Sequence, residues 1–162
     1  MYKRQDLGEF KRSLPFTLTK GQEYAIADAL TDMQRDVPMN RLVQGDVGSG
    51  KTMVAAALCY ACHKNGYQSA IMAPTQILAE QHYKTFQKQL APLGIKCCLI
   101  TGSQPAAQRA ALLAAVRQGE YSVVIGTHAL IQEDVVFSAL GLVVTDEQHR
   151  FGVAQRLSLI HI

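Results

Sequence analysis

One glycine-rich stretch of this chain has the residue types and the spacing of a phosphate-binding loop. The pattern G-x-x-x-x-G-K-[ST] covers Gly45, Asp46, Val47, Gly48, Ser49, Gly50, Lys51 and Thr52. Glycines let successive backbone N–H groups turn inward around an anion, and a helix that starts here adds the positive end of its dipole. The lysine ammonium can reach the β- and γ-phosphates, and the threonine hydroxyl can reach Mg²⁺. The stretch therefore predicts a site for a nucleoside triphosphate.

An acidic pair further along the chain could complete that chemistry. Asp146 and Glu147 directly follow the β-rich run at 142–145, and ligands of open α/β sheets bind at the carboxyl ends of strands. Asp146 is expected to bind Mg²⁺ mainly through its water shell, and Glu147 to orient or deprotonate the water that attacks the γ-phosphate. Adjacent acids also occur in solvated turns, but the loop at 45–52 favours the catalytic interpretation.

Elements that could position these residues alternate along the chain. Helical patterns at 53–66, 75–90 and 104–119 separate most of the β-rich runs, which lie at 41–44, 69–73, 96–101, 122–126 and 142–145. An earlier helix is expected after Thr19, which forms a capping-box pattern with Gln22. Residues 126–141 are expected to be a loop with a short helix. The alternation predicts an α/β fold of the P-loop NTPase type, with a mainly parallel sheet covered by helices on both faces.

Composition limits the class of protein without naming a partner. The chain has 162 residues, 48% of them hydrophobic, and a formal net charge of +3. One domain with its own core is expected, and the mild positive charge neither requires nor excludes a polyanion. No apolar run approaches the roughly 20 residues that span a bilayer. The N-terminal charges also lack an apolar segment behind them, so we expect a cytoplasmic protein that does not enter membranes.

The cysteines admit two interpretations. Cys59, Cys62 and His63 match the C-x-x-C-H pattern of haem attachment, and Cys97 with Cys98 could be imagined to complete a metal site. However, the first pair falls within a predicted helix and the second within a predicted strand, where neighbouring side chains point to opposite faces. Buried free thiols are therefore the favoured interpretation.

Several stretches together resemble the RecG family, which are bacterial ATP-dependent DNA helicases of superfamily 2 that remodel branched DNA. They lie at 14–22, 42–52, 73–82, 100–103, 125–132 and 140–156. The related transcription-repair coupling translocases are an alternative, but they typically have Glu where this chain has Gln148 and Tyr where it has Ser49. A nucleotide-dependent switch that does not act on DNA is a second alternative. Such a switch has no need for the ordered set of strand-end motifs.

The resemblance implies roles for individual residues. Gln22 would contact adenine with Phe16 packed on the base, although its capping-box position offers a competing role. His149 would couple the ATP site to DNA movement and, with Lys51 and Glu147, would form the catalytic set. Strand ends would contact DNA phosphates without reading sequence, through Pro74, Thr75, Thr101, Gly102, Ser103, Gly126, Thr127 and His128. The roles of Arg150 and Arg156 stay open between DNA contact, domain contact and solvation.

The resemblance also implies an arrangement of domains. Residues 14–156 would form the first RecA-like lobe of a monomer that uses ATP and Mg²⁺ on forks and junctions. The second lobe, with its arginine finger, and an N-terminal wedge domain would lie outside this sequence. Residues 1–13 look like a linker, and residues 157–162 resemble the translation of a transposon adapter and are expected to be non-native.

Overall fold

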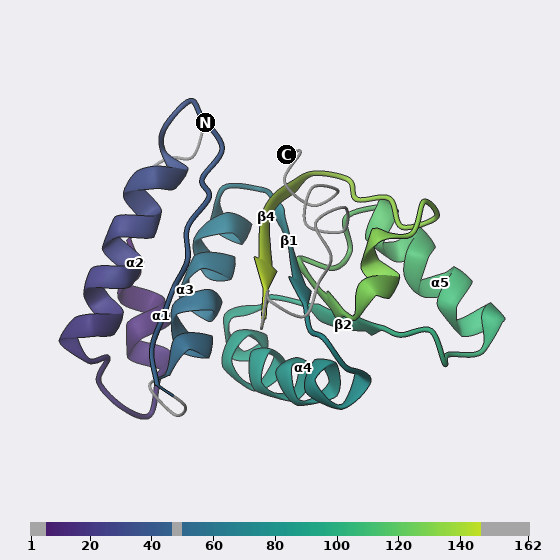
Figure 1. Cartoon of the computed structure of the whole chain (residues 1–162), viewed down its shortest axis with the longest axis horizontal. Helices are drawn as coiled ribbons and strands as arrows, with labels where there is room; N and C mark the ends of the chain where they lie inside the picture. Colours follow the sequence, from purple (N-terminus) through teal and green to yellow (C-terminus); the bar gives the residue numbers. More distant parts are fainter. Residues whose placement is uncertain (1–5, 47–49, 147–162) are drawn as a thin grey trace.

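A computed structural model describes residues 6–46 and 50–146 of the chain. Within these ranges four parallel strands form one sheet in the order β2-β3-β1-β4 (Figure 1). Their bounds are Gln68–Met72 for β1, Cys97–Ile100 for β2, Val123–Gly126 for β3 and Leu140–Thr145 for β4. Met72 pairs with both Gly126 and Thr145, and Ile100 pairs with Gly126. The carboxyl ends of all four strands therefore meet at one edge.

Helices cover both faces of this sheet. The longer helices are α2 at Lys20–Met33, α3 at Lys51–Lys64, α4 at Gln76–Leu90 and α5 at Ala106–Arg117; shorter elements are α1 at Gly8–Ser13, η1 at Ala91–Leu93 and η2 at His128–Ile131. Val123 and Ile125 belong to a core shared with α1, α2, α3 and α4, whereas Val124 belongs to a second core with α5 and η2. Figure 1 shows α2 and α5 at opposite ends of the molecule. The predicted three-layer α/β architecture is confirmed.

Local signals placed most element ends where the sequence predicts them. Thr19 and Gln22 form the expected capping box at the start of α2, and Thr75 accepts a hydrogen bond from the Leu78 amide at the start of α4. Gly66 and Gly119 follow α3 and α5 with φ of 82° and 79°, a left-handed conformation that suits glycine. None of the helices in the described ranges is long and apolar enough to cross a membrane.

The strand predicted at 41–44 is wrong. These residues form no regular secondary structure, and the side chain of Leu42, which a sheet would bury, is 68% exposed. Arg41 instead pairs with Asp32 and lies 3.5 Å from Asp28, both on α2. The β-rich segment is only four residues long, and its ionic contacts attach it to α2 and not to the sheet. Within the described residues β4 is therefore an edge strand.

A short helix also lies where the composition suggests a linker. Phe10 of α1 is fully buried, and its ring centroid lies 5.7 Å from that of Tyr60 on α3. Tyr60 Oη donates a 2.9 Å hydrogen bond to Glu9, and Lys64 Nζ lies 3.4 Å from the same carboxylate. These contacts hold α1 against α3, so residues 8–13 are part of the packed unit.

Candidate functional site

The phosphate-loop residues lie at the start of α3. Since α3 runs into the following strand β1 and packs on it, its amino end lies at the edge where the strands end (Figure 1). Gly50 is the residue that caps α3, with φ of 79° and no side-chain cap. The first N–H groups of a helix have no partners within the helix, and together with the helix dipole they form a site for an anion.

Lys51 is held beside this loop by backbone oxygens. Its Nζ donates to the carbonyl of Gly45 at 2.5 Å and to that of Asp46 at 3.1 Å. An ammonium group has three donors, so two such bonds leave one N–H for a phosphate oxygen. Thr52 follows in the first turn and is partly exposed. Gly45, Asp46, Gly50, Lys51 and Thr52 therefore lie together as the spacing predicts.

Gln22 connects the loop to α2. Its Oε1 accepts a 2.8 Å bond from the Thr19 amide, and its Nε2 donates a 3.2 Å bond to the carbonyl of Gly50. The capping role is thus confirmed, and the same side chain also reaches the phosphate loop, which the sequence did not predict. The adenine contact of Gln22 stays a prediction. Phe16, the expected partner on the base, is 46% exposed.

Asp146 directly follows β4 at the carboxyl edge of the sheet. Its amide donates a 2.9 Å hydrogen bond to the carbonyl of Met72 in β1, which fixes the backbone that carries the carboxylate. Its Oδ2 lies 2.7 Å from Nε2 of His82 on α4. Carboxylate and hydroxyl oxygens are the donors that Mg²⁺ prefers, so Asp146 and Thr52 suit this ion chemically. Bound there, Mg²⁺ would neutralise charge on the phosphates.

His82 is a site residue that sequence reasoning missed. It lies in the stretch at 73–82 used for the family resemblance, but no role was assigned to it. It lies seven positions after Thr75, the N-cap of α4, which is about two helical turns, so the two lie on the same side of the helix. That spacing is the signal that could have directed attention to His82, because Thr75 follows a strand end.

The loops after β1 and β2 are linked by side-chain hydrogen bonds. Ser103 Oγ donates to Gln76 Oε1 at 3.1 Å and lies 3.3 Å from the hydroxyl of Thr101. The Thr101 amide donates to Gln104 Oε1 at 3.1 Å, and Thr101 is buried. Of the residues proposed to contact nucleic acid here, Thr75, Gly102 and Ser103 are exposed and Pro74 is partly exposed.

The loop after β3 is more buried than the loops after β1 and β2. Thr127 is buried, and its hydroxyl accepts a hydrogen bond from the Ala129 amide at the start of η2. A Cβ on Gly126 would lie 2.4 Å from the carbonyl oxygen of Ile100, so close strand packing explains this glycine. His128 is exposed. Among these three residues His128 therefore offers the accessible side chain.

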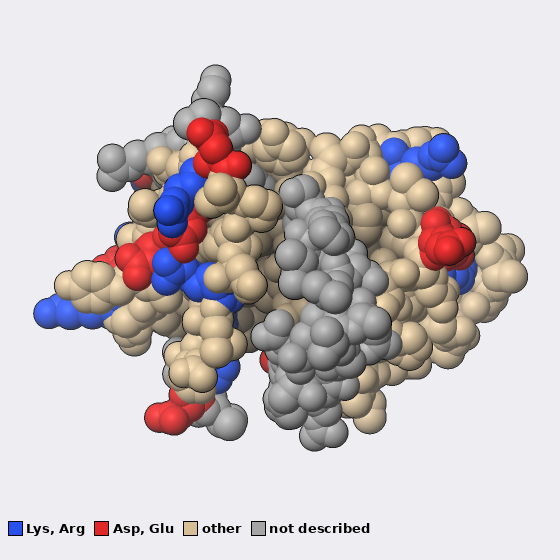
Figure 2. Space-filling model, turned by 45° about the horizontal axis from the view of Figure 1, so that its top comes forward, with Lys and Arg blue, Asp and Glu red and all other residues tan. Residues whose placement is uncertain are grey.

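Charged side chains do not form a patch of one sign on the face seen in Figure 2. Lysine, arginine, aspartate and glutamate gather over the end that carries α1 and α2, with both signs interleaved. Lys11 and Glu23 form a 2.8 Å ion pair there. The described residues on this face therefore present no surface of purely basic character.

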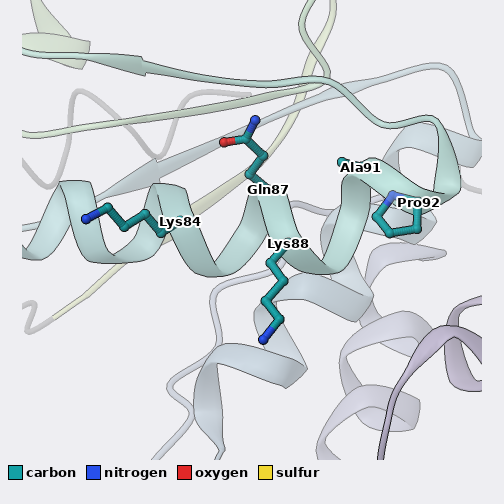
Figure 3. Close-up of a pocket in the computed structure, with 5 residues that line it drawn as sticks. All are labelled: Lys84, Gln87, Lys88, Ala91 and Pro92. Atoms are coloured by element: carbon teal, nitrogen blue, oxygen red, sulfur yellow. The ribbon is translucent and has the colours of Figure 1, made fainter.

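A shallow hollow lies elsewhere, at the far end of α4. Figure 3 shows Lys84, Gln87 and Lys88 around it, with Ala91 and Pro92 completing its lining. Lys88 lies 12 residues after the start of α4, which is about 18 Å along the helix axis. This hollow is therefore remote from the strand ends and from the candidate nucleotide site.

The four cysteines are buried thiols that take part in no disulfide, as predicted. Cys97 belongs to one core and Cys98 to the other, in keeping with the alternation of a strand. Burial raises the pKa of Cys97 and of Cys98 to about 12. Burial also raises the pKa of Cys59, which lies in α3. The thiols of Cys59, Cys97 and Cys98 are therefore neutral at ordinary pH, unlike the thiolates that bind metals.

Several predicted residues lie outside the described ranges. They are Val47, Gly48 and Ser49 of the phosphate loop, Glu147 and His149 of the expected catalytic set, Arg150, Arg156 and the segment 157–162. The roles assigned to the loop, to Glu147 and to His149 stay predictions, and those of Arg150 and Arg156 stay open.

Comparison with known proteins shows the family of the chain. The chain belongs to the DEAD/DEAH box helicase family, whose model matches residues 19–162. It is similar to the ATP-dependent DNA helicase RecG of Aquifex aeolicus, at 54% identity over 147 residues. The same helicase of Bacillus subtilis is 48% identical over 158 residues. The resemblance to RecG inferred from the motifs is confirmed.

Solved structures agree with this assignment. A solved structure of RecG bound to a three-way DNA junction superposes with a TM-score of 0.83 at 48% identity, covering 89% of this chain and 20% of that one. A hypothetical ATP-dependent RNA helicase from Sulfolobus tokodaii shares the fold with a TM-score of 0.65 at 22% identity, covering 88% of this chain and 41% of that chain. The two curated relatives cover 91% and 98% of this chain, which spans 19% and 23% of their length.

Proposed function

We propose that this chain is the ATP-binding, first RecA-like lobe of a RecG-type DNA helicase that remodels forks and junctions. The observation that carries the proposal is the common edge at which α3 begins and β4 delivers Asp146. The helix terminus and Lys51 supply positive groups for phosphates, and Asp146 supplies an oxygen ligand for Mg²⁺. ATP and Mg²⁺ are therefore the proposed cofactors, with Glu147 as the residue that orients the attacking water.

DNA is the proposed partner on the same edge. The loops after β1 and β2 present exposed hydroxyl and backbone groups at Thr75, Gly102 and Ser103, which suit phosphate contacts. The relative of known structure with 48% identity is described as bound to a three-way DNA junction, which supports branched DNA as the substrate. We further propose that the lobe works as part of a cytoplasmic monomer, against a second lobe.

Lys51→Ala tests the nucleotide site. The substitution removes the phosphate-facing ammonium from an exposed position and leaves the core unchanged, so binding of Mg-ATP should fall at least tenfold without loss of the fold. Calorimetric titration measures the affinity, and circular dichroism checks the fold.

Lys88→Ala is the matched control. It removes the same charge from α4, beside the remote hollow in Figure 3. Its affinity for Mg-ATP should equal that of the wild type. Equal affinities of the wild type and Lys51→Ala would contradict the proposed site.

A further inference from the structure

His82 makes a short contact with the carboxylate at the candidate metal site, and its ring is packed against a neighbouring side chain. Its imidazole is 17% exposed, and Nε2 lies 2.7 Å from Oδ2 of Asp146. The ring of Phe86, one turn further along α4, meets the imidazole edge-on with centroids 6.3 Å apart. Phe86 itself is almost fully buried. The imidazole of His82 is therefore packed against Phe86, a core side chain of the same helix.

The direction of this hydrogen bond follows from the chemistry of the two groups. An ionised carboxylate can only accept hydrogen bonds, so Nε2 of His82 carries a hydrogen atom and is the donor of this hydrogen bond. This bond occupies Oδ2 and leaves Oδ1 of Asp146 for the water shell of a metal ion. Asp146 is thus held at two points. Its backbone amide donates to the Met72 carbonyl, and its carboxylate accepts from His82.

Such a donor is the kind of outer group that orients a metal-binding carboxylate. Carboxylates that ligate metals are usually hydrogen-bonded in turn, and removing the outer partner typically lowers metal affinity about 10- to 100-fold. Asp146 is 35% exposed on its side chain, so solvent can replace part of what His82 provides. The lower end of that range is therefore the appropriate expectation.

We propose that His82 is a positioning residue that orients Asp146 for Mg²⁺ in the nucleotide complex. This inference rests on the proposed function and adds to it a residue of α4, an element apart from the phosphate loop and from β4. In this proposal His82 acts through Asp146 and has no role in contacting the nucleotide. Its effect is confined to the metal-dependent part of nucleotide binding.

The test compares ATP affinity of the full chain with Mg²⁺ and with EDTA, at one fixed pH. His82→Ala should reduce affinity about tenfold in Mg²⁺ and leave affinity in EDTA unchanged. His82→Gln carries an amide N–H that can take the place of Nε2–H, and should restore affinity to within about threefold of the wild type. His63→Ala is the matched control, because His63 is a partly buried histidine that instead contacts Ser122 at 2.8 Å.

The outcomes separate this inference from the proposed function. Equal losses in Mg²⁺ and EDTA would assign His82 a general structural role and overturn the inference. Wild-type affinity in His82→Ala, or no recovery in a folded His82→Gln, would also overturn it. If the wild-type chain binds no ATP under either condition, the proposed function fails and the inference with it.

Discussion

Gly50→Ala should damage the start of α3 for two separate reasons. Gly50 has φ of 79°, a left-handed conformation that costs a residue with a Cβ about 1 to 2 kcal/mol. A Cβ built at this position would also lie 2.1 Å from Nε2 of Gln22. A non-bonded carbon and nitrogen cannot lie that close, so the Gln22 side chain must move.

The second cost can be separated from the first. Moving Gln22 breaks its exposed bond to the Thr19 amide and its part-buried bond to the Gly50 carbonyl, each worth about 0.5 kcal/mol. The total loss of unfolding free energy should therefore be about 2 to 3 kcal/mol. Gly66 is the matched control, since it has φ of 82° with nothing within 4 Å of its built Cβ. Gly66→Ala should cost about 1 to 2 kcal/mol, the conformational part alone.

Urea unfolding measures these costs in the single variants Gly50→Ala, Gly66→Ala and Gln22→Ala and in the double variant that combines Gln22→Ala and Gly50→Ala. With Gln22 shortened, the clash is gone, and the added cost of Gly50→Ala should drop to that of Gly66→Ala. Gly50→Ala should also weaken ATP binding, whereas Gly66→Ala lies at the other end of α3 and should not. Equal costs for Gly50→Ala and Gly66→Ala in the wild-type background would refute the contact between Gln22 and the phosphate loop.

Three further outcomes test other parts of the molecule. Phe10→Ala should lower the unfolding free energy in urea by about 3 kcal/mol, because Phe10 is fully buried; a loss under about 1 kcal/mol would mean that α1 does not pack as described. At pH 8 a thiol with a pKa of about 12 is thiolate in only about one molecule in 10⁴, so Cys97 and Cys98 should react with a thiol reagent only on unfolding; rapid labelling of the folded chain would contradict their burial. Residues 1–162 alone should hydrolyse ATP slowly with or without forked DNA, because an arginine finger expected from a second lobe is worth about 10³ to 10⁵ in rate; strong stimulation by DNA would refute a single-lobe role.

Most of the fold could be predicted because its signals are local. The capping box at Thr19, the N-cap at Thr75 and the glycines at 66 and 119 each mark a helix end within a few residues. The prediction of a strand at 41–44 was wrong because the conformation of this segment depends on contacts with residues outside it. Arg41 meets Asp28 and Asp32 of α2, and a four-residue β pattern holds no information about that contact.

The candidate site divides in the same way. Lys51 and Asp146 were predictable because each belongs to a contiguous motif attached to a helix start or a strand end. Gln22 was predictable as a cap of α2, since Thr19 is three residues away, but its bond to Gly50 spans 28 positions. His82 lies 64 positions from Asp146, and no spacing rule joins an α4 histidine to a β4 carboxylate.

The two unpredicted contacts have a common physical meaning. Phosphate loops and strand-end acids are exposed by necessity, because a ligand must reach them, so packing alone cannot fix their geometry. Here Gln22 fixes the carbonyl of Gly50 from α2, and His82 fixes the carboxylate of Asp146 from α4. Each is a polar side chain on a helix anchored in the core by neighbours such as Ile26 and Phe86. The motif residues thus supply the chemistry, while the precision of their placement depends on helices that the motifs do not include.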